Sequence, residues 1–225
     1  MTVEAVVFDW GGTLTPWHTI ELAEAWRAMR LGDDAAERLL AAEETVWARA
    51  RQTQRSGTMD EVFAAAGVTA GPQEIAGYYA WWEEHTYTDP DVRPLWEQLR
   101  SRGIRIGVLS NTLWPRTEHE RVFRRDGVAG LIDAAVYTSE IDWTKPHPAA
   151  FRAVLDALGG IAPEDGVFVG DRPWDDIAGA KGVGMRAVLL PHSEIPAYQE
   201  GPVRGEPDAV VSRLADVLAL VDSWR

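Results

Sequence analysis

The chain has 225 residues, a length that fits one large domain or a core with a smaller insert. A formal net charge of -13 argues against nucleic acid as the main partner, because a phosphate backbone is bound by clustered Lys and Arg. The absence of cysteine excludes disulfides, thiolate metal sites and cysteine nucleophiles, and the lack of a long apolar segment predicts a cytoplasmic protein without a signal peptide or a membrane span.

One strand and then a block of helices are predicted for the first 89 residues. Residues 3–8 are rich in valine and stop at Asp9, which indicates a buried strand followed by a tight turn. Residues 16–89 are rich in Ala, Glu, Arg and Trp, and glycines separate stretches of helical composition. The helices predicted in this block cover 20–29, 35–51, 59–66 and 72–85.

Strands and helices alternate after the turn at Asp89-Pro90. This alternation is typical of parallel βαβ units, so we expect an α/β fold with a doubly wound, Rossmann-like parallel-sheet core, formed by residues 1–15 and 90–225. Residues 16–89 would form an inserted α-helical cap domain, and 191–207 an exposed loop. Strands are predicted at 104–109, 134–137, 167–169, 187–190 and 209–211, and helices at 91–102, 116–125, 148–158 and 214–223.

Four polar segments follow predicted strands, at the sheet edge where open α/β folds bind ligands. A carboxylate at such a strand end can attack phosphorus or carbon and form a covalent intermediate, although a lone Asp there is more often a helix cap. The glycines of the first segment allow close approach of the backbone to a ligand. The segments read FDWGGTL at 8–14, VLSN at 108–111, WTKPHP at 143–148 and VGDRPWDD at 169–176.

The charged residues of these segments indicate a cation site. Asp171, Asp175 and Asp176 form an acidic cluster, and carboxylates that converge on Asp9 would repel each other without a cation among them. Mg²⁺ suits one or two carboxylates together with waters and a substrate phosphate. Lys145, one of only two lysines in the chain, could stabilise negative charge on the nucleophile and on a transferring group.

The four segments, in this order, resemble the motifs of the haloacid dehalogenase-like hydrolases, and the helical insert resembles the cap of one large branch of that superfamily. The resemblance implies a Mg²⁺-dependent hydrolase with Asp9 as nucleophile. It assigns catalytic roles to Asp9, Ser110 and Lys145, and metal ligation to Asp9, the Gly11 carbonyl and Asp171, with Asp176 orienting a metal-bound water and Asp175 assisting. Gly12, Asn111, Trp10 and Trp174 are the candidate substrate-binding residues.

Gly11 departs from this family pattern. Phosphatases of the superfamily carry there a second Asp that protonates the leaving group, and glycine cannot transfer a proton. Thr15 and His18 are nearby candidates for a relocated acid or base. A phosphonatase-like reaction would need a cap lysine, and residues 16–89 contain none. We therefore expect a phosphatase acting on a small phosphorylated metabolite, with a 2-haloacid dehalogenase or a nearly inactive binding protein as alternatives.

Eleven tryptophans offer a further pattern. Trp10, Trp114, Trp143 and Trp174 lie in or just after the four segments, and two interpretations stay open: they line an apolar site beneath the cap, or they pack the core against the cap. The insert tryptophans are expected mainly in the core of the cap. They are Trp17, Trp26, Trp47, Trp81 and Trp82. The sequence carries no signal for the oligomeric state.

Overall fold

A computed structural model describes residues 2–16, 18, 20–191, 202 and 205–225. Trp17 and most of the loop predicted at 191–207 lie outside the described residues. Among the described residues, no helix is both long and apolar enough to cross a membrane.

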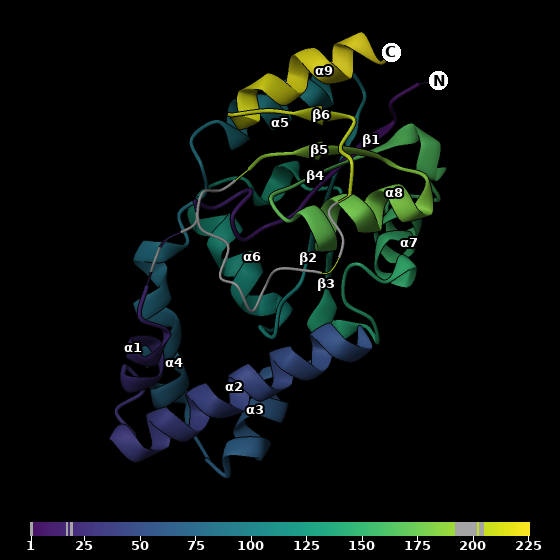
Figure 1. Cartoon of the computed structure of the whole chain (residues 1–225). Coiled ribbons are helices and arrows are strands. Elements are labelled where there is room, and N and C mark those ends of the chain that lie inside the picture. The colour runs from purple at the N-terminus through teal and green to yellow at the C-terminus, as the bar shows by residue number, and fades with distance from the viewer. Residues whose placement is uncertain (1, 17, 19, 192–201, 203–204) are drawn as a thin grey trace.

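Six parallel strands form one sheet in the order β3-β2-β1-β4-β5-β6 (Figure 1). The central strands β1 and β4 are buried along their whole length, as parallel strands covered on both faces should be. The predicted α/β fold is confirmed, with each expected strand present to within one or two residues. The strands are β1 Ala5–Phe8, β2 Arg105–Ser110, β3 Ala134–Tyr137, β4 Gly166–Gly170, β5 Arg186–Leu189 and β6 Ala209–Val210.

Helices cover both faces of the sheet. The side chains of β1 alternate, so Phe8 packs against Trp96 of α5 on one face, while Val7 shares the other hydrophobic cluster with Phe151 of α7. This two-sided core confirms the doubly wound arrangement. The core helices are α5 Val92–Ser101, α6 Arg116–Arg125, α7 Pro148–Ala157, a π-helical segment Pro173–Ala178, α8 Gly179–Val183 and α9 Val217–Ser223. Short 3₁₀ turns lie at Ala129–Leu131, Thr138–Glu140, Pro163–Asp165 and Leu214–Asp216.

Four helices lie between β1 and α5, away from the sheet (Figure 1). They pack on one another around buried residues such as Trp26 and Leu39. The two connections to the core run side by side, since the Asp89 amide donates to the Leu14 carbonyl at 2.8 Å. The exact domain boundaries at 15/16 and 89/90 stay a prediction. The helices are α1 Leu22–Arg27, α2 Asp33–Thr53, α3 Met59–Ala66 and α4 Pro72–Trp82, followed by a 3₁₀ turn Glu83–His85.

The structure adds helix at 173–183, beyond the elements that the periodicity predicts. Pro173 occupies the first position, and the Asp176 carboxylate accepts a hydrogen bond from the Arg172 amide at 2.9 Å. The same carboxylate therefore caps this segment and faces the site described next.

Candidate active site

A cavity of about 920 Å³ lies between the carboxyl end of the sheet and the inserted helices. Each of the four polar segments contributes to its wall, for example through Asp9, Ser110, Lys145 and Trp174. The parallel strands bring these segments to one edge because all their carboxyl ends point the same way. The predicted convergence of distant segments on one cleft is therefore present.

Lys145 joins two of the carboxylates. Its Nζ donates to Asp9 Oδ1 at 2.7 Å and to Asp176 Oδ1 at 2.6 Å, and the lysine side chain is only 2% exposed. Burial by itself would lower the pKa of Lys145, but Asp176 and Asp9 outweigh it, and the pKa lies above its ordinary value. Burial, opposed by Lys145, raises the pKa of Asp176 to about 7. The ammonium is thus held charged, directly beside the proposed nucleophile.

Asp171 lies beside this pair and is short of partners. It is 1% exposed, and its Oδ1 has no hydrogen-bond partner among the described residues, while its Oδ2 accepts from Arg172 Nε at 3.2 Å. Oxygen atoms of Asp9, Asp171 and Asp176 lie within 4.8 Å of one another. Burial raises the pKa of Asp171, and so does the charge of Asp9. A buried, unsatisfied carboxylate oxygen in an all-oxygen cluster fits a hard divalent cation.

Two glycines make room for these carboxylates. Gly12 has φ +88°, and a Cβ on it would lie 2.5 Å from Asp171 Oδ2. A Cβ on Gly170 would lie 2.4 Å from Asp176 Cγ. Gly11 differs, because no atom of the described residues lies within 4 Å of the position its Cβ would take. The missing side chain at Gly11 is therefore not a steric requirement of the fold.

Asn111, in the second polar segment (108–111), holds the backbone of the third segment (143–148). Asn111 Oδ1 accepts from the Lys145 amide at 2.8 Å, and its Nδ2 donates to the Lys145 carbonyl at 3.1 Å. Both ends of the Asn111 side chain thus hold the segment 143–148, which we call the lysine loop. A direct contact of Asn111 with substrate stays a prediction. Ser110 is buried at the end of β2 and lines the cavity.

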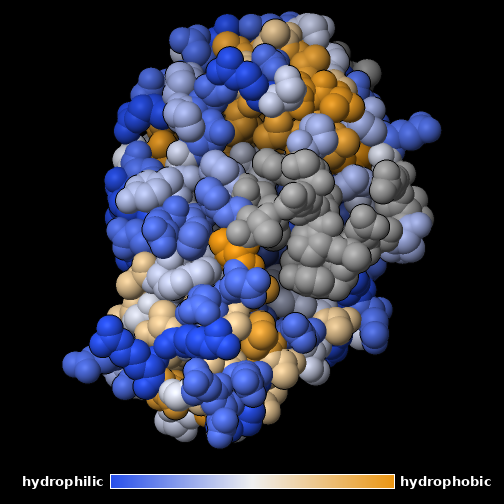
Figure 2. Space-filling model, turned by 60° about the vertical axis from the view of Figure 1, so that its left-hand side comes forward, coloured by the Kyte–Doolittle hydropathy of each residue, from blue (hydrophilic) through white to orange (hydrophobic). Residues whose placement is uncertain are grey.

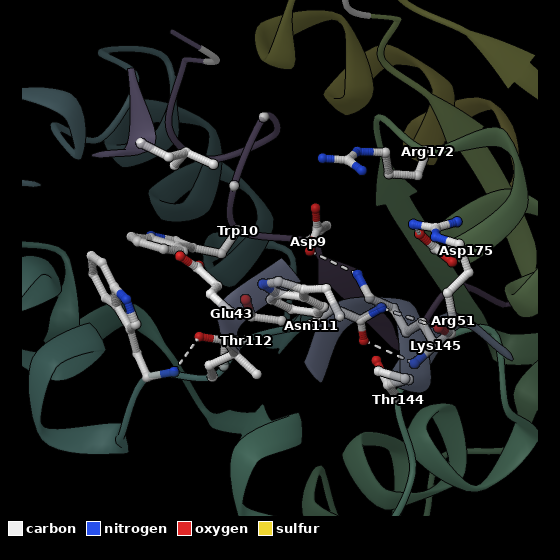
Figure 3. Close-up of a pocket in the computed structure, with 18 of the residues that line it drawn as sticks. Asp9, Trp10, Glu43, Arg51, Asn111, Thr112, Thr144, Lys145, Arg172 and Asp175 are labelled. Atoms are coloured by element: carbon white, nitrogen blue, oxygen red, sulfur yellow. Dashed lines mark hydrogen bonds and ion pairs between the residues drawn. The ribbon is translucent and has the colours of Figure 1, made fainter. Parts of the chain in front are cut away.

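Two arginines that the sequence did not single out also line the cavity. Arg172 contacts Asp171, and Arg51 of α2 reaches Asp175 of the core at 3.8 Å between Nη2 and Oδ2. Figure 3 shows both guanidinium groups on the same side of Asp9, together with Asp175. Arg172 could have been found from its place next to Asp171, but Arg51 lies in a helix with no spacing signal that relates it to the site.

The tryptophans divide between the cavity and its surroundings. Trp10, Trp114 and Trp174 line it, as do Trp47 and Trp82 of the insert. Trp143 does not. Its ring stacks on His147 at 3.9 Å, and the Arg55 guanidinium lies 3.9 Å from its centroid. The first interpretation, lining of the site, is therefore wrong for Trp143, whereas its contact with Arg55 of the insert fits the second, packing of the core against the cap.

The chain is similar to known hydrolases over most of its length. A family model of haloacid dehalogenase-like hydrolases matches residues 3–184. A glyceraldehyde 3-phosphate phosphatase from Methanopyrus kandleri is 29% identical, and the alignment covers 97% of both chains. Among solved structures, a HAD phosphatase from Thermococcus onnurineus has a TM-score of 0.69 at 21% identity, covering 97% of this chain and 98% of the other. An L-2-haloacid dehalogenase from Xanthobacter autotrophicus also has a TM-score of 0.69 at 21% identity, covering 100% of each chain.

Proposed function

The chain belongs to the haloacid dehalogenase-like hydrolases, and we propose that within this family it is a Mg²⁺-dependent phosphatase that acts through an aspartyl-phosphate on Asp9. One observation carries the proposal: Lys145 bridges Asp9 and Asp176, and beside them Asp171 keeps a buried oxygen that has no partner in the described part of the chain. The similarity to a glyceraldehyde 3-phosphate phosphatase supports a small phosphorylated metabolite as the substrate class.

The reaction would take place in two displacements. Asp9 Oδ1 is held by Lys145, and the other oxygen attacks phosphorus as the ester P–O bond breaks. The leaving oxygen takes the electron pair of that bond and a proton from solvent water, and departs as the alcohol. Water then attacks the phosphorus of the aspartyl-phosphate, which releases phosphate and restores Asp9. Lys145 and Ser110 line the cavity and would stabilise the charge of the transferring group, whereas the Gly12 amide donates to the Thr15 carbonyl at 3.0 Å.

Asp9, Asp171 and the Gly11 carbonyl would hold the Mg²⁺, with Asp176 orienting a water on it. The ion would neutralise the charge that accumulates between the carboxylates and the phosphoryl oxygens. The residues themselves fix the position of the nucleophile, since Asp9 and Asp176 share one ammonium.

The proposal is tested with an aryl phosphate, whose leaving group needs little protonation. Wild-type protein with Mg²⁺ should hydrolyse it, and Asp9→Asn should lower kcat/KM by more than about 10³-fold. The control Asp156→Asn removes an exposed carboxylate of α7 and should leave kcat/KM unchanged. Asp171→Asn should abolish the response to Mg²⁺. Activity that survives Asp9→Asn would contradict the proposal, and absence of all turnover would favour a binding protein.

Gly11 keeps dehalogenation as the second candidate. Halide leaves carbon as an anion and needs no proton from the enzyme, so a chain without a carboxyl group at this position loses nothing in that reaction. The unsatisfied Asp171 oxygen argues the other way, because a metal-free displacement leaves it without a partner. Release of chloride from 2-chloropropionate without Mg²⁺, at a rate above that of aryl phosphate hydrolysis, would decide for the dehalogenase.

A further inference from the structure

Glu43 is an acidic residue of the cavity that the proposed chemistry does not use. It lies on α2, lines the cavity, and its Oε2 accepts a hydrogen bond from Trp26 Nε1 at 2.8 Å. The positive groups of the cavity pair with core carboxylates instead: Lys145 with Asp9 and Asp176, Arg51 with Asp175, and Arg172 with Asp171. Among the ion pairs of the described residues, none involves Glu43.

Such a carboxylate is costly in this place. Burial raises the pKa of Glu43, and hydrogen bonds from Trp26 and Trp47 only partly oppose that shift. Glu43 is half-buried, and a carboxylate partly withdrawn from water without a counter-charge is unfavourable unless another group supplies one. The group can come from a ligand, because Glu43 faces a cavity rather than closed core.

Aromatic side chains lie close to Glu43, since Trp26 and Trp47 donate hydrogen bonds to its carboxylate. The cavity wall near it includes Tyr78, whose pKa is raised well above its ordinary value by burial and then by the charge of Glu43. Trp82 and Trp114 lie 5.5 Å apart between ring centroids, and Tyr78 lies 6.2 Å from Trp114. Trp47 lines the same wall. Several aromatic rings and one carboxylate in the wall of the same cavity form the kind of site that attracts an organic cation.

The two ends of the cavity therefore differ in their chemistry. Figure 3 shows Glu43 and Trp10 on one side of Asp9, and Arg51 and Arg172 on the other. The side with Arg51 and Arg172 offers guanidinium donors for an anionic group, and the Glu43 side suits a cation. A ligand that carries both charges would match the two ends at once.

We propose that Glu43 and the rings around it bind an organic ammonium group, so that the substrates are phosphate monoesters of amino or alkylammonium alcohols. The phosphate half of this substrate class rests on the proposed function, whereas the ammonium site does not. We call Glu43, Trp10, Trp47, Tyr78, Trp82 and Trp114 the aromatic end of the cavity.

The ammonium site is tested by binding alone, with choline and its uncharged isostere 3,3-dimethyl-1-butanol as probes on the full chain. The two alcohols have the same shape, so a difference in Kd reports the charge. Titration calorimetry should show choline binding about tenfold more tightly to the wild type. Equal affinity for both probes would overturn the proposal, and this comparison needs no variant.

Glu43→Gln should reduce the preference for choline to about twofold or less, because the amide keeps the shape but not the charge. Glu37→Gln is the matched control: it removes one exposed carboxylate from the same helix and should keep the preference. Circular dichroism confirms that each variant is folded, and Trp82→Leu is a second variant that should also weaken choline binding. A choline preference that persists in Glu43→Gln would contradict the assignment.

Turnover separates this inference from the proposed function. If both hold, kcat/KM for phosphocholine should exceed that for 3,3-dimethylbutyl phosphate by about tenfold, and the ratio should collapse in Glu43→Gln. A choline preference without hydrolysis of any phosphate ester would overturn only the phosphatase. Equal hydrolysis of the two esters, with equal binding of the two alcohols, would overturn only the ammonium site.

Discussion

Gly11 occupies the position where a proton donor would most directly raise the rate of phosphate ester hydrolysis. It stands two positions after the nucleophile, it is half-buried at the cavity wall, and the space for a Cβ is free. A Cβ at this position would meet no described atom within 4 Å, so an Asp could begin here without a clash at its first carbon. The absence of a proton donor here is thus a chemical property of the chain and not a consequence of crowding.

Gly11→Asp should therefore raise the activity of a phosphatase. For an alkyl phosphate, whose leaving group needs a proton, we expect kcat/KM to increase by about 10²-fold or more, and for an activated aryl phosphate by much less. Steady-state kinetics with a pair of such esters checks the difference.

Gly12→Asp is the control for adding a carboxylate to this loop. Its Cβ would meet Asp171 Oδ2 at 2.5 Å in a backbone conformation with φ +88°, so activity should fall. An equal effect of Gly11→Asp on both esters would show that the new group does not act on the leaving alcohol.

At the scale of elements, helix α6 ties together the strand ends that carry the site. Its His119 is fully buried, stacks on Tyr137 of β3 at 4.4 Å, and meets Trp10 edge-on at 4.4 Å. His119 Nε2 also forms a hydrogen bond with Thr112 Oγ1 at 2.9 Å, just after β2. One uncharged ring therefore joins the ends of β1, β2 and β3 behind the cavity.

His119 should make stability depend on pH. Burial, with a smaller contribution from Arg116, lowers the pKa of His119 to about 3 from an ordinary value of 6.5. Between these values the unfolded chain binds a proton that the folded chain does not, so the free energy of unfolding decreases as pH falls, by up to about 1.4 kcal/mol per pH unit.

Denaturant melts of wild type and His119→Gln between pH 7.5 and 4.5 measure this contribution. The variant should lose stability less steeply below pH 6.5, while the difference between the two proteins should be constant above pH 7. Taking the difference cancels the opposite contribution of Asp176, whose pKa is raised to about 7. Identical slopes would mean that His119 titrates normally.

At the scale of the molecule, the insert closes one side of the cavity and is held to the core near the lysine loop. The Thr144 amide donates to the Gln54 carbonyl at 3.0 Å, and the Ser56 amide donates to the Asp142 carbonyl at 3.0 Å. Arg55 lies over the Trp143 ring. Figure 2 shows the mixed polar and apolar surface of one face of the molecule, with the apolar residues gathered in patches. If the insert closes over a substrate, the hinge of that motion would have to lie at a distance from this contact.

The arrangement of tryptophans gives a direct test of where ligands bind. Orthovanadate, a phosphate analogue, should in the presence of Mg²⁺ quench tryptophan fluorescence in the wild type, because five of the described tryptophans line the cavity. Replacement of Trp10 and Trp174 by Phe should remove a large part of the quench. Trp143→Phe should leave it unchanged, because Trp143 faces His147 and Arg55 instead. Loss of the quench in Trp143→Phe would place the ligand elsewhere.

The sequence by itself determined the parallel α/β core and the residues of its carboxyl edge. Strand period, helix composition and turn signals are local, so the limits of most elements could be predicted to within a few residues, and the topology of parallel strands then carried Asp9, Ser110, Lys145 and Asp171 to one edge.

Only the tertiary structure decided how the insert meets that edge. Arg51 and Glu43 come from a helix whose composition predicts nothing beyond helix, and their place in the cavity depends on the angle at which α2 packs. The same holds for Trp143, which turns away from the cavity, and for Asn111, whose amide is used on the Lys145 backbone. Side-chain direction and the approach of separate elements are long-range properties, and no local pattern in the chain encodes them.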